Sequence, residues 1–157
     1  MATKLHIDKS TEDGATKIKL RGVIDEESDF NEIFQDVKPK VVVDFEGITL
    51  INSCGVREWI HALQTLRPAT ELILEKCSPR IVEQINYVSN FVGPGKVVSF
   101  YAPYFCSKCK EERDVLVHTS EMRGAKTMHA PAQKCPQCKS AMEFDDLEEE
   151  YFAFLEG

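Results

Sequence analysis

Apolar residues in the first hundred positions follow two alternating periods, one typical of strands and one typical of helices. Apolar residues that alternate or run together indicate strands at 5–8, 18–24, 41–45, 72–74 and 97–100. Apolar residues spaced by three and four indicate helices over 26–37, 56–66 and 79–88. Strands that alternate with helices indicate an α/β fold with helices packed on a sheet. The turn residues Asp13–Gly14 predict an opening β-hairpin, so the sheet is expected to be mixed.

The most distinctive polar residues of this region lie on one strand-to-helix turn. After the apolar run 41–45, Glu46–Gly47 interrupts the pattern, and residues 48–51 lead to Asn52-Ser53-Cys54-Gly55. Asn52 or Ser53 stands where an N-cap belongs, because a side-chain oxygen there accepts a hydrogen bond from the first helical turn. The N-terminus of a helix is also an anion site. A serine before a helix is common simply as a cap, so the turn is a candidate regulatory site with a plain structural alternative.

Three short segments resemble, in the right order, the STAS family of anti-sigma-factor antagonist domains. They are LRGVID at 20–25, VVDF at 42–45 and INSCGV at 51–56. The resemblance covers roughly the first hundred residues and implies a STAS-like mixed sheet. In signalling members, the serine of an Asp-Ser-x-Gly motif at this turn is phosphorylated by a partner kinase, and phosphorylation switches partner binding. Ser53 falls on that serine, and Asn52 stands where the family usually has aspartate.

The resemblance implies a protein partner, such as an anti-sigma factor with serine-kinase activity. It also implies which residues contact that partner and which residue, Ser53, is phosphorylated. The expected contact residues are Asp25, Asn52, Ser53, Cys54, Gly55 and Arg57. Asp25 is included because the family's strand-end aspartate lies near this turn. A phosphate on Ser53 would add a charge of about −1.5 to −2 at a helix N-terminus, which tolerates it while the surface becomes more negative.

Two cysteine pairs in the last third of the chain predict a metal site. They are Cys106/Cys109 and Cys135/Cys138, separated by twenty-five residues. Each C-x-x-C turn lets two thiolates converge on one ion, and four thiolates complete a tetrahedral Zn²⁺ shell. Because such a shell has no open position for water, we expect one structural zinc ion per chain. The segment CPQCKSAMEF at 135–144 resembles a zinc-ribbon knuckle.

Iron bound as in rubredoxin and dithiol redox chemistry are the alternatives at these cysteines. The rubredoxin family usually has glycine after each cysteine pair, whereas this chain has Lys110 and Lys139 there. Reversible disulfides without bound metal would favour a redox enzyme or sensor. Zinc remains the prediction because four thiolates suit its tetrahedral shell, although the interval between the pairs is somewhat longer than is usual for a zinc ribbon.

The chain of 157 residues is long enough for one domain of about a hundred residues and a small appendage. We expect a STAS-like domain over 1–102, a zinc ribbon over 103–145 and an acidic tail over 146–157. A unit of about forty residues usually needs a metal or disulfides, because its own apolar core is too small. Tyr151 and Phe152 lie among the acids of the tail, which is expected to be loosely docked. A motif that folds onto a partner or onto the ribbon is the alternative.

Charge and composition limit the classes of function that this chain can have. The net charge of −7 divides into −3 over 1–102, +3 over 103–142 and −7 over 143–157, which makes nucleic-acid binding unlikely. No apolar run approaches a membrane span, and the charged start MATKLHIDKS lacks a signal-peptide core, so a cytoplasmic protein is expected. The resemblance to anti-sigma-factor antagonists implies a bacterial protein. No catalytic motif is found, so we expect a non-catalytic adaptor that can form homo-oligomers. The alternatives are a constitutive scaffold and an RNA-polymerase-associated or nucleic-acid-binding ribbon protein.

Overall fold

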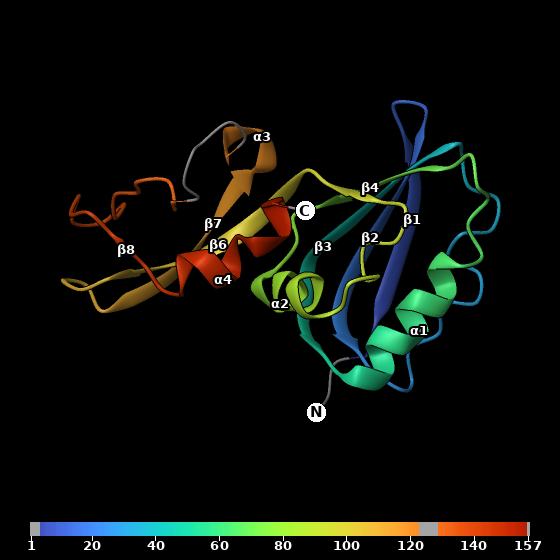
Figure 1. The fold of residues 1–157 in the computed structure, drawn as a ribbon, viewed down its shortest axis with the longest axis horizontal. Coiled ribbons are helices and arrows are strands. Elements are labelled where there is room, and N and C mark those ends of the chain that lie inside the picture. Colours follow the sequence, from blue (N-terminus) through green and yellow to red (C-terminus); the bar gives the residue numbers. More distant parts are fainter. Residues whose placement is uncertain (1–3, 123–128, 157) are drawn as a thin grey trace.

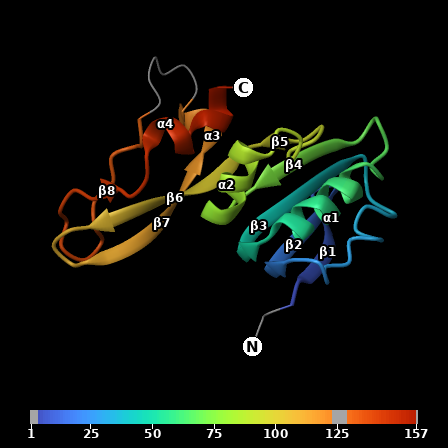
Figure 2. The same cartoon turned by 60° about the horizontal axis from the view of Figure 1, so that its bottom comes forward.

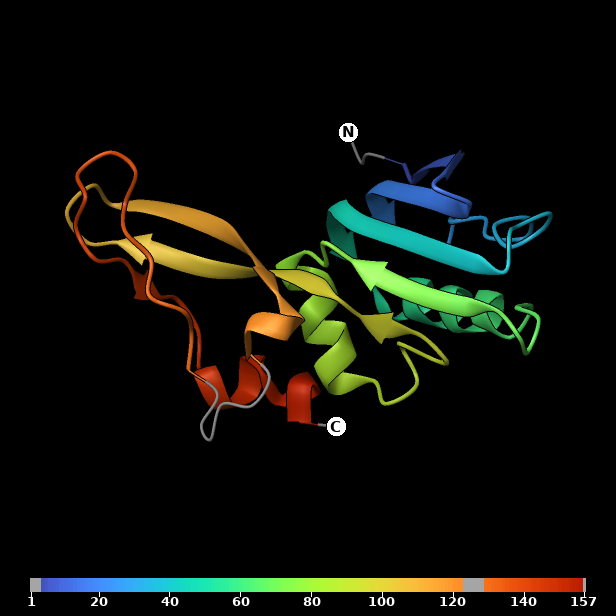
Figure 3. The same ribbon diagram turned by 90° about the horizontal axis from the view of Figure 1, so that it is seen from above.

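The first part of the chain forms a mixed five-stranded sheet that two helices cover (Figure 1). The structure, a computed structural model, describes residues 4–122 and 129–156. The strands, in sheet order, are β1 His6–Glu12, β2 Ala15–Ile24, β3 Lys40–Ile51, β4 Glu71–Glu75 and β5 Lys96–Val97. Only the β1–β2 pair is antiparallel. Helices α1 (Ser53–Leu63) and α2 (Pro79–Tyr87) pack against the same face of this sheet (Figure 3), which confirms the predicted α/β class.

The second part forms a three-stranded sheet that extends from the first as an arm (Figure 3). Its elements are β6 Ser99–Cys106, β7 Glu111–His118, α3 Thr119–Met122, β8 Glu143–Phe144, α4 Glu148–Tyr151 and the 3₁₀ helix η1 Ala153–Glu156. The arm is hydrogen-bonded to the main sheet, because Cys77 N–H donates to the Ser99 carbonyl at 3.2 Å and Tyr101 N–H donates to the Cys77 carbonyl at 2.8 Å. None of the helices within 4–122 and 129–156 has the length and apolarity that crossing a membrane requires.

The expected domain boundary between residues 102 and 103 falls inside β6. Residues 1–3, 123–128 and 157 of the three expected ranges lie outside the described residues. Most buried apolar residues of both parts belong to one cluster, which runs from Trp59 through Phe100 to Phe152. The two parts therefore share one hydrophobic core at the base of the arm.

The helix predicted over 26–37 is wrong. The segment is a series of turns, although Phe30, Ile33 and Phe34 are buried as an apolar helical face would be. Short polar side chains bond to nearby backbone instead: the Asp25 carboxylate accepts from Glu27 N–H at 2.9 Å, and that of Asp29 accepts from Asn31 N–H at 2.9 Å. Such local bonds compete with helix formation. The apolar spacing correctly predicted which residues are buried, but it did not predict the backbone conformation of the segment.

The opening hairpin is confirmed, with a tighter turn than the sequence indicated. Glu12 pairs with Ala15, and both turn residues adopt left-handed conformations, Asp13 at φ 52° and Gly14 at φ 78°. This is the backbone that two-residue hairpin turns require.

The expected end of the strand at Glu46–Gly47 is wrong, because β3 continues through these residues. A side chain at Gly47 would come within 2.5 Å of the Arg21 Cβ on β2, so this glycine permits close strand pairing.

The acidic tail is not loosely docked, which corrects the favoured expectation. Tyr151 and Phe152 are 3% and 1% exposed, and the Phe152 ring stacks on Phe144 at 5.1 Å. The Asn86 amide of α2 donates to the Tyr151 carbonyl at 3.0 Å, and the Tyr151 hydroxyl donates to the Tyr101 carbonyl. Figure 2 shows α2 between the main sheet and the arm. The tail thus joins α2 to the arm.

Candidate functional site

The turn between β3 and α1 leaves Ser53 exposed at the start of the helix. Asn52 is the N-cap: its side-chain oxygen accepts from Gly55 N–H at 2.8 Å, and its carbonyl accepts from Val56 N–H at 2.9 Å. Ser53 is the first helical residue, and its side chain lies at the surface. Of the two cap candidates in the sequence, the structure selects Asn52. The Ser53 hydroxyl is therefore not needed to cap the helix.

Glu26 also belongs to this turn, although the sequence did not single it out. The Asn52 amide donates to a Glu26 carboxylate oxygen at 2.8 Å, and this hydrogen bond lowers the pKa of Glu26. The contact arises because β2 and β3 are parallel and end together, with Ile24 opposite Ile51. An aspartate at position 52 could not donate this bond. The parallel pairing of the two strand ends was the signal that could have indicated Glu26.

The other residues expected at this site lie around the same strand ends. Asn52 N–H donates to the Ile24 carbonyl at 3.1 Å, which places Asp25 next to the turn. Gly55 is buried, and a Cβ there would lie 2.4 Å from the Ile24 carbonyl oxygen, so glycine permits α1 to approach β2. Arg57 is exposed and contacts the half-buried Cys54 sulfur at 3.7 Å. The site thus combines an exposed hydroxyl, four polar neighbours and a tightly packed base.

Replacing Asn52 separates its two roles. We expect Asn52→Ala to lower the free energy of unfolding by about 1 kcal/mol, because the cap of α1 is lost. We expect Asn52→Asp to keep the cap but to raise the pKa of Glu26, because a second carboxylate replaces the donating amide. Urea unfolding and an NMR titration of the glutamate side chains measure the two effects. Asn31→Ala is the matched control, since Asn31 is exposed, and an equal loss there would contradict the cap.

The four cysteines of the arm meet at its far end. Cys106 and Cys109 flank the β6–β7 turn, while Cys135 and Cys138 come from the segment before β8, and all four sulfur atoms lie within 4.8 Å of one another. The Cys106–Cys138 and Cys109–Cys135 sulfur distances are 3.6 and 3.8 Å. A tetrahedral shell with Zn–S bonds of about 2.3 Å has sulfur atoms about 3.8 Å apart. A disulfide would need about 2.05 Å, so this geometry fits a metal.

The two cysteine turns have the same backbone form. Lys110 N–H donates to the Cys106 carbonyl at 2.8 Å, and Lys139 N–H donates to the Cys135 carbonyl at 2.9 Å. Lys110 (φ 58°) and Lys139 (φ 64°) are both left-handed, a conformation that glycine adopts without strain. Hydrogen bonds from Ser140 lower the pKa of Cys138 to about 6, whereas hydrogen bonding to Cys138 raises the pKa of Cys109 to about 12. The lysines therefore do not disturb the shape of a metal-binding knuckle.

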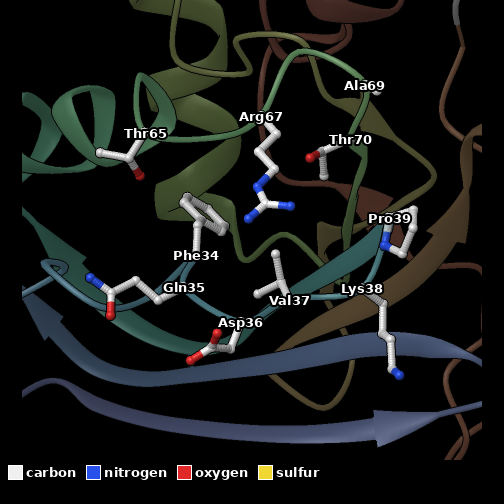
Figure 4. A pocket seen from close by; sticks show the side chains of 10 residues that line it. All are labelled: Phe34, Gln35, Asp36, Val37, Lys38, Pro39, Thr65, Arg67, Ala69 and Thr70. Atoms are coloured by element: carbon white, nitrogen blue, oxygen red, sulfur yellow. The ribbon is translucent and has the colours of Figure 1, made fainter.

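A cavity of about 510 Å³ lies at the opposite end of the main sheet from Ser53. It is lined by the 34–39 turn and by the segment that precedes β4 (Figure 4). Figure 4 shows the Arg67 side chain extending toward Phe34 and Val37. No residue expected at the regulatory turn lines it, so this cavity is separate from the candidate site.

Comparison with known proteins finds a similarity between the three-dimensional structure of this chain and a solved structure. No protein-family model matches this sequence, and no curated protein matches it. Among solved structures, the chain is similar to the crystal structure of an anti-sigma factor antagonist from Mycobacterium paratuberculosis, with 14% identity and a TM-score of 0.49. The alignment covers 62% of this chain and 89% of that chain. At this identity and TM-score, the similarity indicates nothing about the partner or chemistry of this protein.

Proposed function

We propose that this protein is a non-catalytic adaptor that binds a regulatory protein through the Ser53 turn. The observation that carries the proposal is the exposed Ser53 at the N-terminus of α1, with the cap supplied by Asn52 instead. The resemblance of the surrounding segments to anti-sigma-factor antagonists supports a signalling partner, such as an anti-sigma factor with serine-kinase activity. The proposed contact surface contains Asp25, Asn52, Ser53, Cys54, Gly55 and Arg57.

Phosphorylation of Ser53 is the proposed switch. The N-terminus of an α-helix of eleven residues favours a negative group through its N–H groups and its dipole. Glu26, which is hydrogen-bonded to the neighbouring Asn52, adds negative charge to the same turn. A phosphate would make this already acidic surface more negative, and a partner that fits the neutral serine would be repelled. The helix itself would tolerate the modification.

Zinc is the metal that we propose for the four cysteines of the arm, in a structural role. Four thiolates leave no open coordination position, which suits structure rather than catalysis. The spacing of 3.6 to 3.8 Å between paired sulfurs supports this reading. Zinc would hold the end of the arm, and the arm would supply a second surface for the partner. The proposed units are the STAS-like part, the ribbon and the tail.

The switch is tested by comparing two Ser53 variants in partner capture from the cells that make the protein. We expect Ser53→Ala to retain the partner and Ser53→Asp to lose at least about 90% of it, because buried like charge at an interface costs several kcal/mol. Ser89→Asp, at an exposed serine beyond α2, is the matched control. Equal capture by the two Ser53 variants, or loss with Ser89→Asp, would contradict the proposal.

A further inference from the structure

A second cavity, of about 500 Å³, lies where the main sheet meets the arm. Its walls come from the middle of β3, the start of α2, the β6–β7 hairpin and the segment before α4. Four of its carboxylates have no salt-bridge partner among the described residues: Glu46, Asp114, Asp145 and Asp146. The lining arginine, Arg80, is paired with Glu83 at 3.6 Å. The cavity is therefore strongly negative.

A buried hydroxyl in the same cavity is the second observation. Ser78 lines it, is 6% exposed, and its hydroxyl has no hydrogen-bond partner within residues 4–122 and 129–156. Ser78 is the N-cap residue of α2, yet its side chain makes no cap bond. A buried hydroxyl without a partner is costly, and such groups are uncommon unless something pairs with them. A serine hydroxyl can both donate and accept, so a donor group that enters the cavity can pair with it.

We propose that this cavity binds an alkylammonium or guanidinium group between the Ser78 hydroxyl and its carboxylates that lack a salt bridge, of which Glu46 already accepts from the Tyr101 hydroxyl and Asp146 from Leu147 N–H. Three donor hydrogens on an ammonium, or five on a guanidinium, match several acceptors at once. The Ser78 hydroxyl accepts one of them after rotation about its single side-chain torsion. Burial raises the pKa of Asp114 above its ordinary value, as expected for a carboxylate without a nearby cation. A bound cation would lower it again.

The group has two natural sources, a basic side chain of a protein and a free polyamine. Thr49 lines the cavity and lies four residues before Ser53 on the strand that leads into the turn. A partner that covers the Ser53 turn would therefore reach the cavity with a lysine or arginine side chain. This assignment of the source rests on the proposed function, whereas the cation site itself does not.

The test is an NMR titration of the full, zinc-loaded chain with defined probes at physiological salt. The probes are spermidine, an acetylated peptide containing Lys-Arg-Lys, and the same peptide with glutamine at those positions. We expect saturable shifts at the Ser78 and Asp114 amides with the cationic probes alone. Asp114→Asn combined with Asp145→Asn should weaken binding at least about tenfold, because hydrogen bonds to charged groups are lost. Spermidine binding as tightly as the peptide would assign the site to polyamines.

Two controls distinguish a specific binding site from general electrostatic attraction to an acidic protein. Asp29→Asn combined with Glu32→Gln makes the same charge change at exposed residues away from the cavity, and should leave binding unchanged. Ser78→Ala should weaken binding while the melting temperature holds or rises, since no cap bond is lost. Equal weakening by both double variants, or absence of saturable binding to spermidine and to the peptide, would overturn the proposal. Because neither probe involves Ser53, the result is independent of the phosphorylation switch.

Discussion

Replacing Cys135 by serine is expected to release the metal and unfold the end of the arm. Cys135 is buried, and its sulfur lies 3.8 Å from that of Cys109. Structural zinc binding contributes on the order of 10 kcal/mol or more in small metal-dependent units, which have little other core. The base of the arm should remain folded, because Phe100 and Phe152 belong to the shared core. The effect is therefore expected to be large and local.

Limited trypsin digestion with mass spectrometry measures this effect. Lys108, Lys110, Lys134 and Lys139 are exposed beside the cysteines. We expect slow cleavage at these lysines in the metal-loaded protein and rapid cleavage in Cys135→Ser or after chelation. The loaded protein should contain about one zinc ion per chain. Cys54→Ser is the matched control, since this half-buried cysteine lies on α1. Wild-type protein that lacks metal, or that resists trypsin equally without it, would contradict the zinc site.

Phe152→Ala is expected to be the most destabilising change in the tail. Phe152 is 1% exposed, and the centroid of its ring lies 5.1 Å from that of Phe144 and 6.0 Å from that of Phe100. Truncating a buried phenylalanine costs about 3–5 kcal/mol, because a cavity replaces its contacts. This is a large share of the roughly 5–15 kcal/mol that stabilises an ordinary domain. Urea unfolding followed by far-UV circular dichroism measures the loss.

The tail offers its own control for this change. Leu147 begins the same short helix and is 63% exposed, so Leu147→Ala should change the free energy of unfolding by less than about 0.5 kcal/mol. Loss of the Phe152 ring should also increase hydrogen exchange at α2, since Asn86 bonds to the Tyr151 carbonyl. Similar stability losses for the two variants would show that the tail does not join the arm to the main sheet.

Prediction from the sequence worked where local pattern and local chemistry agree. The buried run 41–45 and the helices predicted over 56–66 and 79–88 all correspond to observed elements. The two cysteine pairs meet as their spacing indicated. The helix prediction for segment 26–37 failed because a second backbone conformation buries the same apolar residues. Turns held by Asp25 and Asp29 bury the same side chains without helical hydrogen bonds.

What the sequence by itself determined is the α/β class and the order of most elements of the main sheet, because these depend on residues close together in the chain. It also predicted that the four cysteines converge, because two C-x-x-C pairs complete one tetrahedral metal shell. Only the tertiary structure decided the pairing of Asn52 with Glu26, the burial of Phe152 and the acidic cavity around Ser78. Each of these joins segments that lie 26 or more residues apart in the chain. Such contacts depend on strand order and on how the arm folds back on α2, which no local periodicity encodes.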